Sequence, residues 1–421
     1  MKLKALNGFK DILPAEAIGW QQIEYLSRDI FQRFGYKEIR LPIMEETELF
    51  ARSIGQATDI VEKEMYTFPD KGITLRPEAT ASLLRAFIEH NMHVQQPVTR
   101  LYTFGPMFRH ERPQKGRLRQ FHQLDAEIIG ADEPLVDAEM MAMGQLLLTE
   151  LGLEASLEIN SLGCPSCRPA FREKLVAYLQ KFEVQFCSDC RRRTQTNPLR
   201  VLDCKNPRCR ELVQNAPSIL HSLCPDCKDH FELVQDAMNN LEVAYSVNRF
   251  MVRGLDYYTR TTFEFIAGNL GAQSAVGAGG RYDGLIKDLG GPELSGIGFA
   301  MGIERLVLLM QEKKNSEQCQ PAATDIYVAA LGDDATRYAS VLVHSLRKNG
   351  IKAAMDYSGR SLKAQMKLAG RLNSRFALIL GDQELENEEA ILRNMKKQDQ
   401  QNISLQGGPA DLVKILEISN I

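Results

Sequence analysis

Charged, aromatic and amide side chains recur along residues 99–130 at the spacing that a β-strand would place on one face. Apolar and polar residues alternate up to Arg109 and again from Leu118, with the turn-forming Pro113 and Gly116 between them, which predicts a long antiparallel hairpin with a basic tip. Side chains two apart point to the same side of a strand. The face shared by the two strands is therefore predicted to carry Arg109, Glu111, Arg117, Arg119, Phe121, Gln123 and Glu127.

This set of side chains suits a site for a nucleoside triphosphate whose α-phosphorus is attacked by a carboxylate. Arg109 would neutralise a phosphate through a forked contact, and Phe121 would offer a ring on which a base can stack. Gln123 and Glu127 would hold a cationic substrate. The alternative is the solvated face of a half-exposed sheet, which is common for a single strand. Two adjoining strands with the same bias favour a binding site.

The segment FRHERPQKGRLRQF, residues 108–121, resembles the second signature motif of the class II aminoacyl-tRNA synthetases. The HQLDAE that follows resembles the histidine-specific members of bacterial type. The resemblance implies a catalytic role for Arg109, which would contact both ATP and histidine, and histidine contacts by Gln123 and Glu127. The implied ATP-binding residues of the hairpin are Arg109, Glu111, Arg117 and Phe121, and the implied contacts to the acceptor end of the tRNA are Gln114 and Lys115.

Residues 70–90 predict a strand, a turn at Pro77 and a helix from about Glu78. Glu78 and Thr80 would lie in the first turn of that helix, where an acid and a hydroxyl commonly cap the free amide groups. In the family that the chain resembles, the matching positions hold the α-amino group of the substrate. The resemblance therefore implies histidine-binding roles for Glu78, Ala79 and Thr80. Upstream, the strand broken at Pro42 resembles the first class II motif, which implies a homodimer interface.

Charged residues interrupt an otherwise apolar segment at residues 250–267. A charged group on a buried element needs a partner. One interpretation is structural: Asp256 would form an ion pair with Arg253 or Arg260.

The other interpretation rests on two further motifs. RGLDYYTRTTFE, residues 253–264, resembles the first histidine-specific motif of the family. That resemblance implies that Arg253 is catalytic and lies against the α-phosphate and the amino-acid carboxylate, and that Tyr257 and Tyr258 form the imidazole pocket. GAQSAVGAGGRYDGLI, residues 271–286, resembles the second such motif; its glycines suit a backbone close to a ligand, and it lacks the GxxxxGK[ST] pattern of a P-loop.

Residues 295–310 predict a strand leading into a helix that is apolar on nearly all sides. Arg305 is an isolated charge near the start of this helix, and a buried guanidinium is stable only near an anion such as the end of a triphosphate. Gly296, Gly298, Gly302 and Arg305 resemble the third class II motif. The resemblance implies that Arg305 binds ATP.

Eight of the nine cysteines fall within residues 163–230, a segment predicted to be a small inserted domain. They form four close pairs, three spaced CxxC and one CxxxxC, and two such pairs can hold one tetrahedral zinc ion. A segment this short buries little core, so structural zinc would contribute on the order of 10 kcal/mol to folding. The alternative is a set of small buried residues without metal. The candidate ligands, whose pairing the sequence leaves open, are Cys164, Cys167, Cys187, Cys190, Cys204, Cys209, Cys224 and Cys227.

Because the family does not require these cysteines, the zinc is expected to be structural and remote from Arg253. At least one ion per chain is expected, and two if all eight thiolates engage. The surplus of arginine in this insertion, including Arg191, Arg192 and Arg193, suggests that it clamps the acceptor arm of the tRNA.

Beyond a polar linker at residues 313–324 the pattern changes to a βαβαβ series, which predicts a parallel-cored sheet with helices on its faces. Residues 347–375 carry eight basic residues and a single acid. Lys363, Lys367 and Arg371 would lie on one side of a helix, which is either a plain solvated face or a basic binding surface. The resemblance implies that this module binds the anticodon.

A chain of 421 residues exceeds what one hydrophobic core usually organises, so two or three domains are expected. The resemblance implies the fold class, which is α+β. The predicted parts are a catalytic core with the antiparallel sheet of class II synthetases at residues 1–162 and 231–312, a cysteine-rich insertion at 163–230, a linker at 313–324, and an α/β anticodon-binding domain at 325–421.

Composition excludes few functions. Hydrophobic residues make up 44% and charged residues 25%, and no apolar run approaches the roughly 18 residues of a membrane span. The first residues have no apolar stretch of signal-peptide length, so a cytoplasmic location is expected and disulfides are disfavoured. With a net charge of −3, any RNA contact must come from local basic patches.

Taken together, the resemblance implies an enzyme that joins histidine to ATP in the presence of Mg²⁺ and passes the adenylate to the 3′ end of histidine tRNA. One alternative is a synthetase-like regulatory subunit of histidine biosynthesis, a class that lacks the anticodon module and loses the arginines. Arg109, Arg253 and Arg305 are all present here. A second alternative, a zinc-ribbon nucleic-acid adaptor, rests only on the cysteines.

Overall fold

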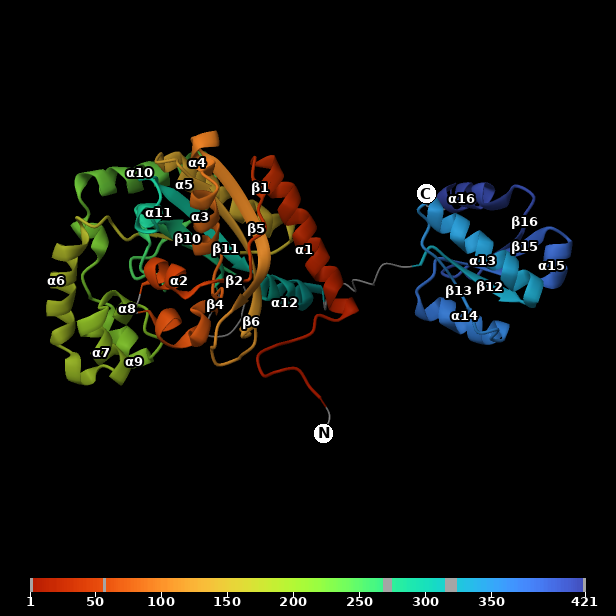
Figure 1. Cartoon of the computed structure of the whole chain (residues 1–421), viewed down its shortest axis with the longest axis horizontal. Helices are drawn as coiled ribbons and strands as arrows, with labels where there is room; N and C mark the ends of the chain where they lie inside the picture. Colours follow the sequence, from red (N-terminus) through yellow and green to blue (C-terminus); the bar gives the residue numbers. More distant parts are fainter. Residues whose placement is uncertain (1–2, 56–57, 268–274, 315–323, 419–421) are drawn as a thin grey trace. The chain divides into compact units, whose positions relative to one another are not determined.

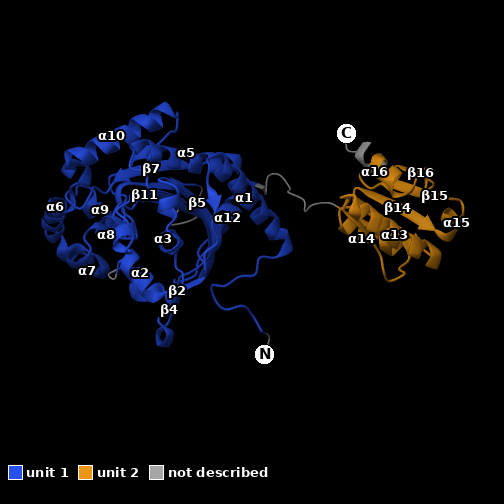
Figure 2. Ribbon diagram, turned by 45° about the horizontal axis from the view of Figure 1, so that its top comes forward, with its two compact units in different colours: residues 1–317 blue, residues 318–421 orange. Residues whose placement is uncertain are grey.

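The computed structural model describes residues 3–55, 58–267, 275–314 and 324–418, and the chain divides into two compact units, Met1–Glu317 and Gln318–Ile421 (Figure 2). The division falls within the predicted linker, most of which lies outside the described residues, as do residues 271–274 of the second histidine-specific motif. In the described part of the chain, no helix is long and apolar enough to cross a membrane.

The first unit is built on an eight-stranded sheet in the order β1-β5-β6-β11-β10-β9-β7-β8. Figure 1 labels β1, β5, β6, β10 and β11 of this sheet. The strands from β5 to β7 pair antiparallel, and β1 and β8 add parallel edges. The bounds are β1 Lys37–Glu38, β5 Thr99–Phe108, β6 Gln120–Ile129, β7 Ser156–Ser161, β8 Ser246–Val247, β9 Thr259–Ile266, β10 Ala275–Arg281 and β11 Gly296–Gly302. A separate sheet has the order β2-β4-β3, with β2 Met44–Glu46, β3 Tyr66–Phe68 and β4 Ile73–Leu75. The predicted α+β class with an antiparallel sheet is confirmed.

The predicted hairpin at residues 99–130 is present. Its strands β5 and β6 have ten residues each and pair along their whole length, and residues 109–119 connect them. Strand alternation sends Leu124, Ala126 and Ile128 into the apolar core, and it leaves the intervening side chains of β6 on the other face. That second face becomes the floor of the cavity described below.

A helical layer packs against the apolar face of the sheet. Phe31 and Met141 of the helices and Phe299 of β11 are almost wholly buried in the core between the two layers, and burial of each such side chain contributes about 1.5–3 kcal/mol. The layer consists of α1 Pro14–Arg33, α5 Pro134–Glu150, α10 Pro225–Asn240 and α12 Ile303–Lys314. The other helices outside the insertion are α2 Thr47–Ile54, α3 Thr80–Glu89, α4 Met92–Gln95 and α11 Leu285–Asp288.

The cysteine-rich insertion is helical and belongs to the same compact unit as the sheet. Its helices are α6 Arg168–Gln180, α7 Ser188–Thr196, α8 Leu199–Leu202 and α9 Pro207–Val213. Phe171, Leu175 and Leu179 anchor an apolar cluster that also takes in Val252 and Tyr258 from the segment before β9. The insertion therefore has more core than its length suggests, and it shares that core with Tyr258, a predicted histidine-binding residue.

The second unit is a five-stranded sheet in the order β13-β12-β14-β15-β16, parallel among the first three strands and antiparallel among the last. The predicted βαβαβ series is present, and a hairpin extends it. Lys363, Lys367 and Arg371 are exposed on α14. The bounds are β12 Ile326–Leu331, α13 Asp333–Lys348, β13 Ala353–Met355, α14 Leu362–Arg371, β14 Phe376–Gly381, α15 Asp382–Glu386, β15 Glu389–Asn394, β16 Gln400–Ser404 and α16 Gly408–Ile418.

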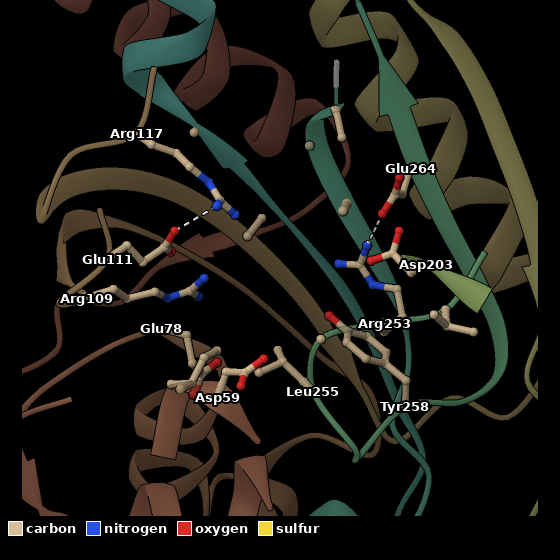
Figure 3. A pocket seen from close by; sticks show the side chains of 18 of the residues that line it. Asp59, Glu78, Arg109, Glu111, Arg117, Asp203, Arg253, Leu255, Tyr258 and Glu264 are labelled. Atoms are coloured by element: carbon tan, nitrogen blue, oxygen red, sulfur yellow. Dashed lines mark hydrogen bonds and ion pairs between the residues drawn. The ribbon is translucent and has the colours of Figure 1, made fainter. Parts of the chain in front are cut away.

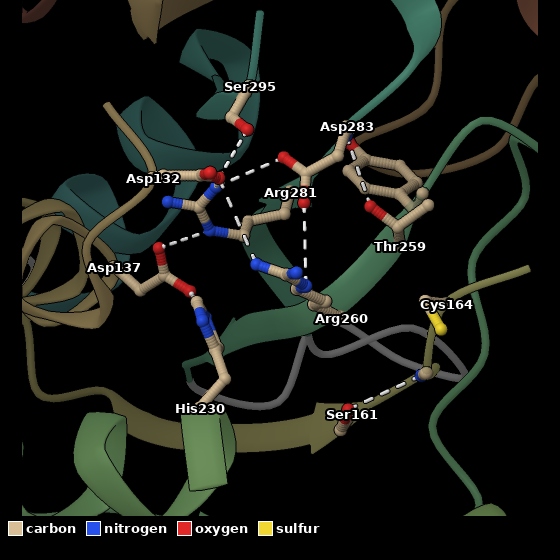
Figure 4. A network of polar contacts seen from close by, with 12 residues as sticks. Asp132, Asp137, Ser161, Cys164, His230, Thr259, Arg260, Arg281, Asp283 and Ser295 are labelled. Atoms are coloured by element: carbon tan, nitrogen blue, oxygen red, sulfur yellow. Dashed lines mark hydrogen bonds and ion pairs between the residues drawn. The ribbon is translucent and has the colours of Figure 1, made fainter. Parts of the chain in front are cut away.

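A buried ion network ties β10, α5 and α10 together (Figure 4). Arg281 and Asp137 have no exposed side-chain surface, and Arg281 Nε lies 2.7 Å from Asp137 Oδ1. His230 Nε2 lies 2.9 Å from the other oxygen of Asp137. Arg281 also donates to Asp283 at 3.0 Å and to the carbonyl of Ala131 at 2.9 Å. Each buried charge has a partner, which offsets the cost of removing it from water.

Removing one member of this network should destabilise the first unit. Arg281→Ala leaves the Asp137 carboxylate buried without its cation, at an expected cost of about 3–5 kcal/mol, measurable as a lower Tm. Lys287→Ala is the matched control, because Lys287 and its partner Glu293 are 59% and 79% exposed, and such a pair contributes at most about 1 kcal/mol. Equal melting temperatures for the two variants would contradict the assignment.

Candidate active site

A cavity of about 950 Å³ lies over the face of β6 that the helical layer leaves free (Figure 3). The hairpin, strands β9 to β11, the start of α3, the segment before β9 and the insertion all contribute to its walls. The predicted residues that line it are Glu78, Thr80, Arg109, Glu111, Arg117, Phe121, Gln123, Glu127, Arg253, Tyr257, Tyr258 and Arg305, with Cys187 and Cys204. The other predicted site residues are not among the described residues that line the cavity: they are Ala79, Gln114, Lys115 and the remaining six predicted cysteine ligands.

Glu127 is buried in the middle of β6, with 2% of its surface exposed. Its carboxylate accepts hydrogen bonds from the hydroxyl of Thr80 at 2.7 Å and from the hydroxyl of Tyr282 at 2.8 Å. Strand β11 leaves room for it at Gly298, where a Cβ atom would lie 1.6 Å from Glu127 Oε2. Burial raises the pKa of Glu127 to about 8, although both hydrogen bonds favour the charged form.

Glu78 accepts hydrogen bonds from the backbone N–H groups of Thr80 and Ala81, at 2.8 and 2.9 Å. The capping alternative therefore holds for Glu78, whereas the Thr80 hydroxyl is directed to Glu127. Burial raises the pKa of Glu78. Ala79 has no exposed surface and lies between these two residues in the chain.

Asp125 is a cavity residue that sequence reasoning missed. It is 1% exposed, and its Oδ2 atom has no hydrogen-bond partner among the described residues. Burial, followed by the nearby Glu127 and Glu78, raises the pKa of Asp125 well above its usual range. The two-residue spacing from Gln123 through Asp125 to Glu127 is the signal that could have found it. This end of the cavity is therefore rich in carboxyl groups.

The hairpin end of the cavity is cationic. Arg109 donates to the carbonyl of Pro77 at 2.9 Å, and its guanidinium lies 5.3 Å from the centre of the Phe121 ring. Arg117 and Glu111 form an ion pair of 2.8 Å, visible in Figure 3. These side chains come from the ends of β5 and β6 and from the loop between them.

Arg305, on α12, lines the same end of the cavity. It donates to the carbonyl of Gly116 at 3.2 Å and to the carbonyl of Ala275. Burial lowers the pKa of Arg305, and the neighbouring Arg117 adds to the effect. The role of Arg305 in binding a phosphate stays a prediction.

The tip of the hairpin lies outside the residues that line the cavity. Gln114 and Arg117 exchange backbone hydrogen bonds of 3.0 and 2.9 Å across the turn. Lys115 Nζ lies 2.7 Å from Glu312 on α12. Both predicted tRNA contacts are therefore on the exterior of the hairpin loop.

The prediction that Arg119 shares the cavity face is wrong. Its backbone N–H donates to the carbonyl of Gly8 at 2.8 Å, and its side chain packs so closely on Gly8 that a Cβ atom there would lie 2.6 Å from Arg119 Cγ. Residues 109–119 form a loop, so the two-residue period of a strand does not apply to them.

Arg253 faces the hairpin arginines from the opposite wall (Figure 3). Its Nη1 atom lies 2.6 Å from Glu264 Oε1, and its guanidinium lies 5.2 Å from the centre of the Tyr258 ring. The rings of Tyr257 and Tyr258 are 4.6 Å apart. Glu264, within β9, is a partner that sequence reasoning missed; its signal is an acid between Phe263 and Phe265 in the same motif as Arg253.

Asp256 pairs with neither of the arginines that the structural interpretation offered. Asn197 of the insertion donates to Asp256 Oδ1 at 3.1 Å, and Arg260 pairs with other acids. Arg200 of the insertion donates to the backbone carbonyl of Arg253 at 3.3 Å. Side chains of the insertion therefore hold the segment that carries the predicted catalytic arginine.

The insertion also forms one wall of the cavity. Arg193 and Arg200 make ion pairs of 3.2 and 3.7 Å with Asp59 of the core. Lys205 lines the cavity from the connection between α8 and α9, and burial lowers its pKa. The wall is thus attached to the core through paired charges.

The eight cysteines form two clusters, within each of which all four Sγ atoms lie within 4.8 Å of one another. One consists of Cys164, Cys167, Cys224 and Cys227, and the other of Cys187, Cys190, Cys204 and Cys209. Sγ separations of 3.6, 3.8 and 3.9 Å match the edge of about 3.8 Å of a tetrahedron with Zn–S bonds of about 2.3 Å. They are too long for disulfides, which need about 2.05 Å. The thiol sets fit tetrahedral zinc.

The position of the second cluster corrects one expectation. Cys187 and Cys204 line the same cavity as Arg253, so this cluster is not remote from the predicted catalytic arginine. The cavity as a whole offers carboxyl and phenol groups at one end and guanidinium groups at the other. Such a cavity can hold a polyanion beside a small cationic molecule.

Comparison with known proteins agrees with this chemistry. A family model described as histidyl-tRNA synthetase matches residues 8–306, and one described as anticodon binding domain matches residues 325–414. A histidine–tRNA ligase from Desulfotalea psychrophila is 59% identical over 409 residues, covering 97% of this chain and 95% of that protein. One from Syntrophotalea carbinolica is 52% identical over 411 residues, 97% of each.

The solved structure of the apo histidyl-tRNA synthetase from S. aureus is 41% identical, covers 96% of this chain and 98% of that chain, and superposes with a TM-score of 0.80. The resemblance seen in the motifs is confirmed over both compact units. The chain belongs to the histidyl-tRNA synthetase family.

Proposed function

We propose that this chain is a histidine–tRNA ligase, which activates histidine with ATP and Mg²⁺ and transfers the histidyl group to the 3′ end of histidine tRNA. The observation that carries the proposal is a single cavity in which carboxyl and phenol groups suited to histidine lie beside arginines suited to ATP. Relatives that match nearly the whole chain are histidine–tRNA ligases, which supports catalysis over the regulatory-subunit alternative. A zinc-ribbon adaptor would leave the cavity without a role.

Histidine would occupy the end of the cavity around Glu127. Its cationic amino group would offset the desolvation that raises the pKa of Glu127, and Tyr257 and Tyr258 would wall the imidazole ring. The proposed histidine-binding residues are Glu78, Ala79, Thr80, Arg109, Gln123, Glu127, Arg253, Tyr257 and Tyr258.

ATP would lie along the hairpin end, with Mg²⁺ on its phosphates. The proposed ATP-binding residues are Arg109, Glu111, Arg117, Phe121 and Arg305. The histidine carboxylate attacks the α-phosphorus and pyrophosphate leaves, while Arg109 and Arg253 face the α-phosphate from opposite walls. The buried Nε of Arg253 has no partner in the described structure, which leaves a donor for a substrate oxygen.

The tRNA would contact three separate surfaces. Gln114 and Lys115 at the hairpin tip would meet the acceptor end, and the exposed Arg191 of the insertion would lie against the acceptor arm. Arg193 is committed to its ion pair with Asp59. The exposed basic side of α14 would meet the anticodon.

Each cysteine cluster would hold one structural zinc ion, giving two ions per chain. The proposed ligands are the thiolates of each set of four, and the zinc would cross-link segments of the insertion that are far apart in sequence. We assign the ions no chemical step.

The chain would act as a homodimer in the cytoplasm. Ile43 and Met44, which follow Pro42 in the predicted interface motif, are apolar and 44% and 49% exposed. The eight cysteines of the described residues form no disulfide, which agrees with a reducing compartment.

Histidine should be the only standard amino acid that supports exchange of labelled pyrophosphate into ATP. A buried site that hydrogen-bonds polar groups rejects substrates lacking them by roughly 10⁴-fold or more. Glutamine and asparagine, polar but without an imidazole ring, are the informative competitors. Exchange supported by another amino acid would refute the assignment, and absence of exchange would favour the regulatory-subunit alternative.

Arg253→Ala should lower kcat for adenylate formation by about 10²- to 10³-fold, because a fixed cation meets charge that grows on the α-phosphate in the transition state. The KM for histidine should change little. Arg249→Ala, an exposed arginine four residues away that does not line the cavity, is the control and should retain full activity. A change confined to KM would mean that Arg253 serves binding alone.

Protein purified under reducing conditions without chelator should contain two zinc ions per chain. The clusters predict which double substitutions act on one site: Cys164→Ser with Cys224→Ser should lose one ion, whereas Cys164→Ser with Cys204→Ser should lose both. Elemental analysis measures the ratio. Less than half an equivalent in the wild type, with all eight thiols freely reactive in the folded protein, would show that the cysteines serve only as packing residues.

A further inference from the structure

Half of the described cations that line the cavity come from the insertion rather than from the synthetase-type core. Of the described residues that line it, eight are Lys or Arg, and four of these belong to the insertion: Arg193, Arg200, Lys205 and Arg210. None of these four belongs to the motifs from which the substrate-binding residues were inferred. Their partners in the folded protein therefore decide what each is available to do.

Three of the four are engaged by protein groups. Arg193 and Arg200 are paired with Asp59, and Arg210 Nε donates to the carbonyl of Cys204 at 3.2 Å. Lys205 differs. Within the described part of the chain, its ammonium group makes no hydrogen bond or ion pair, although the residue is exposed to the cavity that it lines.

The backbone that carries Lys205 is firmly held. The residue lies in the short connection between Cys204 and Cys209, which belong to the same thiol cluster and are both buried. Immediately after it, the side chain of Asn206 accepts a hydrogen bond from the backbone N–H of Arg208 and caps α9. The ammonium group of Lys205 is therefore carried on a flexible aliphatic side chain by a backbone segment that its neighbours hold in place.

Lys205, Arg117 and Arg305 line the same cavity. The charged groups that act on Lys205 electrostatically are these two arginines of the hairpin end and the acids Asp203 and Glu111. Arg117 is already paired with Glu111, and Arg305 donates to backbone carbonyls. A triphosphate at this end would carry four negative charges opposite Mg²⁺ and three partly engaged arginines, Arg109 included, so a further cation would stabilise it.

We infer that Lys205 is a further substrate-binding residue, which reaches from the insertion to the phosphate oxygens of ATP at the end of the cavity formed by Arg117 and Arg305. The inference rests on the proposed ATP site. It makes the insertion part of the activation step, in addition to any contact that it makes with tRNA.

Pyrophosphate exchange by Lys205→Met, measured at varied ATP and varied histidine, tests the inference. Loss of one hydrogen bond to a charged group should lower kcat/KM for ATP by about 10- to 100-fold, while the KM for histidine stays within about twofold. Lys205→Arg should recover most of the loss. Lys181→Met, an exposed lysine of the insertion that does not line the cavity, is the matched control.

Zinc content and Tm of each variant establish that the cluster is intact, and Lys205→Gln replaces the methionine variant if they change. ATP binding to wild type and variants by calorimetry, without histidine, gives a readout independent of turnover. A wild type without histidine-dependent exchange would overturn the proposed function. An active wild type whose Lys205 variants keep normal ATP kinetics and binding would overturn only this inference, as would a defect confined to transfer onto tRNA.

Discussion

A carboxyl group buried in the middle of a β-sheet is the constraint on which the cavity depends. Glu127 is stable there because Thr80 and Tyr282 donate to its two oxygens and Gly298 leaves the space that it fills. These residues come from α3, from the end of β10 and from β11, so the hairpin has its functional form only when all three elements are assembled around it. A buried polar group without partners would cost several kilocalories per mole, and that penalty makes the assembly specific.

Arginines in the walls of the cavity, which are less buried than Glu127, are also held by specific partners. Each wall presents an arginine oriented by an acid, Arg117 by Glu111 and Arg253 by Glu264, so the guanidinium groups are placed before any substrate arrives. Preorganised charge of this kind costs no rearrangement during reaction. Asp59 of the core forms ion pairs with Arg193 and Arg200 of the insertion. These ion pairs attach the insertion to the core, so that it forms one wall of the cavity.

Local patterns in the amino-acid sequence determined much of this protein by themselves. Two-residue alternation was sufficient for the hairpin at residues 99–130, and the switch to a βαβαβ pattern was sufficient for the second unit. Periodicity depends only on neighbours in sequence, so it can be recognised without knowledge of the fold. The family could be recognised from the order and the residues of the motifs around Arg109, Arg253 and Arg305. The spacing of the cysteines indicated tetrahedral thiol sites, but it did not show which cysteines belong to the same cluster.

Only the tertiary structure decided which distant groups meet. Cys164 joins Cys224, sixty residues away, because the insertion returns to its own starting point, and spacing says nothing about that return. Asp256 is satisfied by Asn197 instead of a neighbouring arginine for the same reason. Arg119 does not line the cavity, because it lies in a loop, where the two-residue period of a strand does not apply. Lys205 lines the cavity because the insertion forms one of its walls. Contacts between remote segments are set by packing and by the partners that buried charges require, and neither is written in a local pattern.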